Sequence, residues 1–199
     1  ENFKDFDRDA ENLCIYHGVD MDGWCSAELV NEYCAAKGWG GVHFVGMNYQ
    51  ITDPWMYELY QAMPVLRRVF IVDYHIEPKE VFALLKKGIE VFWYDHHTTA
   101  IDKYAPYMHD LHQYDTFHCL TSTAISAAAL TLQSLVALSS KDLYESLLVH
   151  YPNVFDVVRL VSTWDTWNKS DPETFERAKC LNSGLFERVH PPFGVFHKM

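Results

Sequence analysis

The sequence has few cysteines, few basic residues and no long apolar run, and each shortage excludes a class of protein. The cysteines are odd in number and include no C-x-x-C pair, which argues against a disulfide framework or a thiolate zinc site. A reducing cytoplasm fits this cysteine usage. Lys and Arg total 16 against 27 Asp and Glu, and the resulting net charge of -11 disfavours binding to long nucleic acid.

Apolar runs such as residues 69–72 and 89–94 are far shorter than the roughly 20 residues that a membrane span needs. The chain also opens without the apolar core and cleavage site of a secretory signal. We therefore expect a soluble protein with no membrane partner. Its 199 residues, 49% of them hydrophobic, suffice for one compact domain with a small appendage.

Short apolar strands alternate with helical segments in the first half of the chain, which predicts an α/β fold with a parallel sheet. The expected strands cover residues 12–17, 42–45, 68–72 and 89–94, and the expected helices cover 23–37, 54–62 and 77–87. From about residue 121 the alanine-rich sequence and the segment 153–164 predict a mainly helical second half. We expect the main domain at residues 1–170 and a C-terminal extension at 171–199.

Histidines and aspartates follow the expected strands where each one ends. His17, Asp20 and Asp22 come after the first strand, Asp73 after the third, and Asp95, His96 and His97 after the fourth. Ligands of open parallel sheets bind outside the carboxyl ends of the strands. The sequence therefore predicts that these side chains converge at one edge of the sheet.

Imidazole and carboxylate side chains together suit ions such as Mn²⁺, whereas Ca²⁺ prefers oxygen ligands alone. Asp20 and Asp22 are two residues apart, so in an extended segment they would point the same way, toward neighbouring ions. Asp73 could then bridge the ions, and Asp165, isolated in an apolar segment, is a further candidate. Two ions about 3.5 to 4 Å apart can clamp a phosphoryl group and acidify a water.

Four segments, in this order, resemble the metal-binding motifs of the DHH phosphoesterase superfamily, in particular its oligoribonuclease-like members. They read HGVDMDGWCSA from residue 17, VDY from 72, DHH from 95 and WDTW from 164. The resemblance covers about residues 12–170. It implies two Mn²⁺ ions and an activity that releases 5′-mononucleotides from short oligonucleotides or dinucleotides.

By position, the resemblance also assigns the ligands. It places His17, Asp20 and Asp73 around one ion, and it places Asp22, Asp73, His96 and Asp165 around the other. His97 would face the substrate, stabilising the phosphate or helping the leaving oxygen depart. His97 and Asp73 are thus the expected catalytic residues, and Thr123 is expected near the substrate, at the position of a family glycine. No Gly-rich GGGH-like segment is found, so we expect the domain that grips nucleic acid to be absent or minimal.

Other interpretations remain open at this stage. The same set of metal ligands would serve a pyrophosphatase or a phosphomonoesterase. A non-catalytic, metal-dependent nucleotide-binding module would also keep some of these ligands. Taken singly, each motif could be an ordinary turn, loop or cap. The oligomeric state is open as well.

Several residues around the motifs carry secondary expectations. We expect Trp24, Trp93, Trp164 and Trp167 to pack in the core rather than to stack on bases, although Trp24 could reach a ligand. His109, His112 and His118 are expected on a surface loop, and Arg159, Lys169 and Arg177 are the better placed cations for a phosphate.

Overall fold

The computed structural model describes residues 7–48, 62–139 and 142–186, and it contains a five-stranded parallel sheet. The strands are β1 (Asn12–His17), β2 (Val42–Met47), β3 (Arg68–Val72), β4 (Glu90–Asp95) and β5 (Phe117–Thr121). Their order across the sheet is β2-β1-β3-β4-β5, and every neighbouring pair is parallel. The predicted α/β fold with a mainly helical second half is confirmed.

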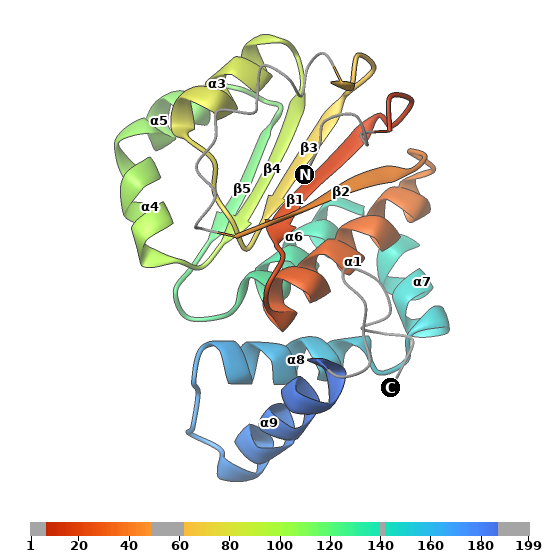
Figure 1. Cartoon of the computed structure of the whole chain (residues 1–199), viewed down its shortest axis with the longest axis vertical. Coiled ribbons are helices and arrows are strands. Elements are labelled where there is room, and N and C mark those ends of the chain that lie inside the picture. The colour runs from red at the N-terminus through yellow and green to blue at the C-terminus, as the bar shows by residue number, and fades with distance from the viewer. Residues whose placement is uncertain (1–6, 49–61, 140–141, 187–199) are drawn as a thin grey trace.

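Helices cover both faces of the sheet (Figure 1). One face packs against α1 (Met21–Lys37) and α6 (Ala127–Ser139), and α7 (Asp142–His150) and α8 (Val154–Asp165) pack on these two helices. The other face lies against α3 (Pro78–Lys86), α4 (Thr98–Tyr104), the 3-10 turn Ala105–Tyr107 and α5 (Met108–Leu111). Because both faces are buried, the central strands are apolar throughout instead of alternating with polar residues.

Alternate residues of each strand supply the two cores. Phe70 and Phe92 are register partners on the α1 and α6 face, and their rings stack with centroids 4.4 Å apart. Ile71 and Trp93 are the next pair and belong to the opposite core. This alternation follows from the two-residue repeat of a strand.

The strand β5 was not predicted, and His118 lies on it instead of on a surface loop. The His118 ring stacks on Phe92 with centroids 4.6 Å apart, and its Nε2 lies 2.9 Å from a carboxylate oxygen of Glu90. These contacts let a polar residue occupy a strand position. The helix expected from residue 121 therefore begins later, at Ala127, and the helix expected at 54–62 falls almost wholly outside the described residues.

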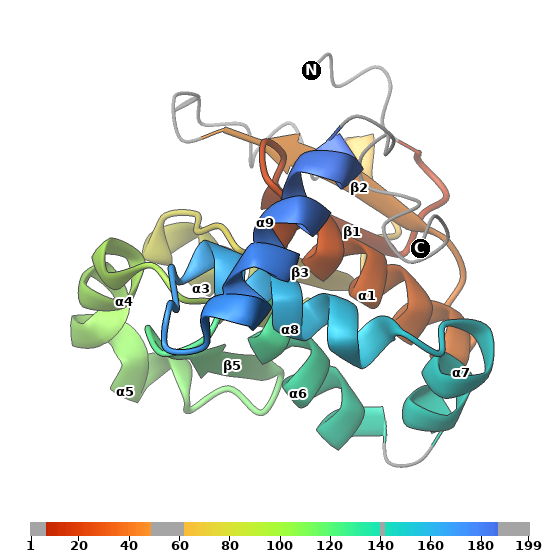
Figure 2. The same ribbon diagram turned by 90° about the horizontal axis from the view of Figure 1, so that it is seen from below.

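The last two helices, α8 and α9 (Pro172–Phe186), pack against each other beyond the carboxyl ends of the strands (Figure 1). Seen from below, they lie in front of α1 (Figure 2). Trp24 and Trp93 are core residues as expected, but Trp164 is only partly buried and Trp167 is 60% exposed. None of the helices in the described ranges is long and apolar enough to cross a membrane.

Close backbone contact fixes the turn from β1 into α1. Asp20 caps the helix, and its Oδ1 accepts a hydrogen bond of 3.0 Å from the Gly23 N–H. A Cβ atom built on Gly23 would lie 1.9 Å from the His17 carbonyl oxygen, so no side chain fits there. The glycine allows the first turn of α1 to lie directly on the end of β1.

We expect Gly23→Ala to lower the free energy of unfolding by at least about 3 kcal/mol, because a backbone carbonyl must move to admit the methyl group. Gly41→Ala is the control, since a Cβ there meets nothing within 4 Å. Urea titrations followed by circular dichroism would compare the two. Equal, small losses for both variants would contradict the close packing.

Candidate metal centre

Six predicted ligands meet at the carboxyl edge of the sheet. They come from the end of β1, the start of α1, the residues after β3 and β4, and the end of α8, and are His17, Asp20, Asp22, Asp73, His96 and Asp165. One feature of this edge differs from expectation. Asp20 has an extended backbone, but α1 begins at Met21, so Asp22 lies in the first helical turn.

The first group contains His17, Asp20 and Asp73, whose potential ligand atoms all lie within 4.8 Å of one another. The Nδ1 atom of His17 is 2.6 Å from Asp20 Oδ2 and 3.6 Å from Asp73 Oδ2. One imidazole nitrogen and two carboxylates therefore face a common point.

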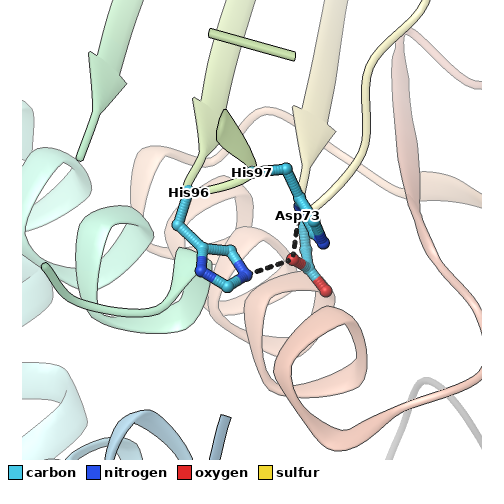
Figure 3. Close-up of side chains that lie close together, drawn as sticks. All are labelled: Asp73, His96 and His97. Atoms are coloured by element: carbon cyan, nitrogen blue, oxygen red, sulfur yellow. Dashed lines mark ion pairs between the residues drawn. The ribbon is translucent and has the colours of Figure 1, made fainter. Parts of the chain in front are cut away.

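The second group contains Asp22, His96 and Asp165 within the same limit. The Nε2 atom of His96 lies 3.1 Å from Asp165 Oδ2 and 3.7 Å from Asp22 Oδ2. It also lies 3.4 Å from Asp73 Oδ1, so the Asp73 carboxylate touches both groups, one with each oxygen. Figure 3 shows His96 and Asp73 reaching toward each other from neighbouring strand ends.

The backbone holds Asp73 in an unusual conformation. Its φ angle is 53°, in the left-handed region that aspartate tolerates better than most residues. Its N–H donates a hydrogen bond of 2.9 Å to the Tyr94 carbonyl, and its side chain is 1% exposed. Backbone outliers of this kind are typical of functional sites.

The N-terminus of α6 fixes Asp22, which the sequence did not reveal. The N–H groups of Ala127 and Ala128 donate to the two Asp22 carboxylate oxygens at 2.8 and 2.9 Å. The helix dipole favours a carboxylate at this end. Thr123, expected near the substrate, lies exposed in the turn before α6.

Asp95 orients His97, a role that the sequence analysis did not assign. Asp95 Oδ1 is 2.8 Å from His97 Nδ1 and accepts a second hydrogen bond of 3.1 Å from the His97 N–H. A carboxylate on one ring nitrogen fixes the tautomer and the orientation of the ring. Nδ1 of His97 also lies 3.7 Å from Asp73 Oδ1, and both histidines after β4 flank that carboxylate (Figure 3).

Crowding of buried carboxylates perturbs their protonation. Burial, followed by the charge of Asp22, raises the pKa of Asp73 well above its usual range. Burial and the charge of Asp22 also raise the pKa of Asp165, to about 7. Burial alone would lower the pKa of His17, but hydrogen bonds to Asp20 and Asp73 outweigh it and raise the pKa to about 9.

Histidines are the ion-pair partners of the candidate carboxylates within the described ranges, with no lysine or arginine among them. Asp165 Oδ2 is buried without a hydrogen bond, its contact being the ion pair with His96. Mixed imidazole and carboxylate donors suit Mn²⁺-like ions once their protons have left. Groups of these residues could therefore hold a divalent cation.

A groove of about 550 Å³ lies nearby, between α6 and α8. Its lining is largely apolar and includes Ser162 and Thr166, which flank Asp165 in the sequence. None of the six candidate ligands lines it. The groove is thus separate from the polar cluster.

We expect Mn²⁺ affinity to rise between pH 6 and pH 8. The raised pKa of Asp165, about 7, means that a proton occupies this ligand at pH 6 and must leave before the ion binds. The raised pKa of His17 acts in the same direction up to about pH 9. Calorimetric titration at three pH values measures the effect, and an affinity independent of pH would contradict this ligand set.

We expect Asp73→Asn to abolish tight Mn²⁺ binding without lowering the unfolding temperature of the metal-free protein at pH 8. The pKa of Asp73 is raised on folding, so its ionisation costs stability as the pH rises, and asparagine carries no such cost. Asparagine also tolerates a positive φ angle. Thermal unfolding in a chelator tests this, and a clear loss of stability would show that Asp73 is structural.

Comparisons with known proteins bear on the fold of the chain. No family model and no curated protein matches it. A solved structure described as an uncharacterized protein from Helicobacter pylori G27 is similar, with a TM-score of 0.56 and 15% sequence identity. The match covers 89% of this chain and 49% of that one, so the chain spans about half the length of its structural neighbour. At this identity the likeness supports the α/β fold alone.

Proposed function

We propose that the protein is a two-metal phosphodiesterase that hydrolyses short oligonucleotides or dinucleotides to 5′-mononucleotides. The observation that carries this proposal is the pair of ligand groups that share Asp73. Their members come from the four motifs that resemble DHH phosphoesterases, in the same order along the chain. Within the described residues Asp73 belongs to two groups of potential ligands, one with His17 and Asp20 and the other with His96 and His97, and Asp22, His96 and Asp165 form a third.

The chain's own residues would hold the two ions. His17, Asp20 and Asp73 would bind one ion, and Asp22, His96, Asp165 and Asp73 would bind the other. When bound, a pair of ions, Mn²⁺ by resemblance, polarises a phosphoryl group and acidifies water. The α6 N–H groups on Asp22 keep that carboxylate oriented for its ion.

His97 would handle the leaving group. Its Nδ1 is occupied by Asp95, so Nε2 is the ring atom that would hold a proton for the departing oxygen or hydrogen-bond the phosphate. The His97 side chain is 33% exposed, more than any of the other histidines in the site. It would therefore meet the substrate from the solvent side.

Size and charge favour a small substrate. With a net charge of -11, the protein would repel long polyanions, while a compact pair of ions can still bind one or two phosphates. The cysteines Cys14, Cys25, Cys34, Cys119 and Cys180 are all free thiols, which agrees with a proposed location in the cytoplasm.

The activity can be tested on the purified chain with a 5′-phosphorylated dinucleotide, a short RNA, a cyclic dinucleotide and pyrophosphate, each with Mn²⁺ or EDTA. We expect Mn²⁺-dependent mononucleotide release that falls about 100-fold or more in Asp22→Asn and Asp73→Asn. Asp156→Asn is the matched control, because this exposed α8 carboxylate pairs with Arg159 and Arg177 outside the site. Phosphate release from pyrophosphate alone would favour an anhydride hydrolase, and metal binding without turnover would favour a binding module.

Asp95→Asn should reduce kcat about 10- to 100-fold while Mn²⁺ affinity stays near the wild-type value. The amide would weaken the hold on His97 Nδ1, but Asp95 belongs to none of the three-residue groups. An unchanged kcat would indicate that Asp95 only supports the fold.

A further inference from the structure

Trp167 follows the last candidate ligand and combines two unusual features. Its side chain is 60% exposed, and its φ angle is 50°, in the left-handed region that bulky aromatic residues rarely occupy. Hydrogen bonds impose this conformation: the Trp167 N–H donates to the Trp164 carbonyl at 3.1 Å, and the Asn168 N–H donates to Thr163 at 3.0 Å. A large aromatic ring is thus exposed to solvent on a residue with a strained backbone conformation.

Packing of the helix pair leaves the Trp167 ring largely exposed. Trp164 already joins α8 to α9, because its ring is partly buried and stacks on Phe175 with centroids 5.6 Å apart. Trp167 lies against both rings, at 5.1 Å from Trp164 and 5.9 Å from Phe175. Its ring forms the outer part of this aromatic contact and remains 60% exposed.

A cation accompanies this aromatic group. Lys169 Nζ lies 4.9 Å from the centre of the Trp167 ring and 5.2 Å from that of Phe175. Arg159 and Arg177 are both paired with Asp156, whereas Lys169 pairs with no carboxylate within the described residues. In a chain with a net charge of -11, an ammonium group held on an aromatic surface suits an anionic aromatic ligand.

The aromatic group directly follows the last candidate ligand in the chain. Trp167 is two residues from Asp165, whose Oδ2 lies 3.1 Å from His96 Nε2. The hydrogen-bonded turn joins these two positions without a flexible linker. The end of α8 therefore carries both a candidate ligand and an exposed aromatic ring.

We infer that Trp167 is a stacking site for a nucleobase of the substrate and that Lys169 binds a phosphate of the same molecule. Base stacking on a tryptophan tolerates any base, since every base has an aromatic face. The substrate class would then be nucleotides of mixed sequence, and not pyrophosphate or sugar phosphates. This inference rests on the proposed phosphodiesterase function for its substrate, but its binding step can be measured without turnover.

The test is calorimetric binding of AMP and of ribose 5-phosphate to the full chain with Mn²⁺. Trp167→Asn removes the aromatic ring and suits the positive φ angle, so the turn should persist. We expect this variant to bind AMP roughly 10- to 100-fold more weakly and ribose 5-phosphate within twofold of wild type. Trp167→Phe should keep most AMP affinity, and Tyr107→Ala, a comparably exposed aromatic packed on Phe82 of α3, should leave both affinities unchanged.

The outcomes separate this inference from the proposed function. Selective loss of AMP binding in Trp167→Asn, with no dinucleotide cleavage by the wild type, would uphold the stacking site and refute the hydrolase. Mn²⁺-dependent cleavage by the wild type, with equal AMP affinity in the wild type and Trp167→Asn, would uphold the hydrolase and refute the stacking site. Lys169→Gln should weaken the binding of AMP and of ribose 5-phosphate several-fold and reduce its salt dependence. Unchanged affinities and an unchanged salt dependence would show that Lys169 is not part of the site.

Discussion

The burial of the Asp73 carboxylate among three other aspartates is the constraint on which the rest of the site depends. Asp73 is 1% exposed, and burial together with the charges of its neighbours raises its pKa well above the usual range. Such a group is stable as an anion only with compensating positive charge. Within the described residues the ion-pair partners of Asp73 are histidines, and a bound metal ion would supply further positive charge. The repulsion between these buried carboxylates destabilises the metal-free protein, and the same repulsion would favour the binding of a cation.

The sheet makes this crowding possible because parallel strands end at one edge. β1, β3 and β4 are neighbours, so the residues that follow them are brought together although they are up to about 80 positions apart. Helices complete the arrangement from both sides: α1 carries Asp22, α6 donates two N–H groups to it, and α8 ends on Asp165. A site built on the ends of packed elements is held more rigidly than one built on a long loop.

The turn after α8 connects the candidate chemistry to a candidate specificity. Asp165 faces the cluster, while Trp167, two residues later, faces solvent beside Lys169. Activity and recognition would then be coupled through one short hydrogen-bonded segment. The apolar groove between α6 and α8 contributes none of the six ligands and is a separate feature.

The sequence by itself determined the parallel α/β class, four of the five strands and the six side chains that meet at the sheet edge, because apolar periodicity and polar residues at strand ends are local signals. Other features depend on partners distant in the chain. β5 pairs with β4, where His118 stacks on Phe92 and meets Glu90, and α6 begins at Ala127 where its first N–H groups reach Asp22, about 105 residues away. The exposure of Trp167 likewise depends on the α8–α9 contact, in which the Trp164 ring stacks on Phe175. Only the tertiary structure decides such features, since their energies arise between segments that no local pattern relates.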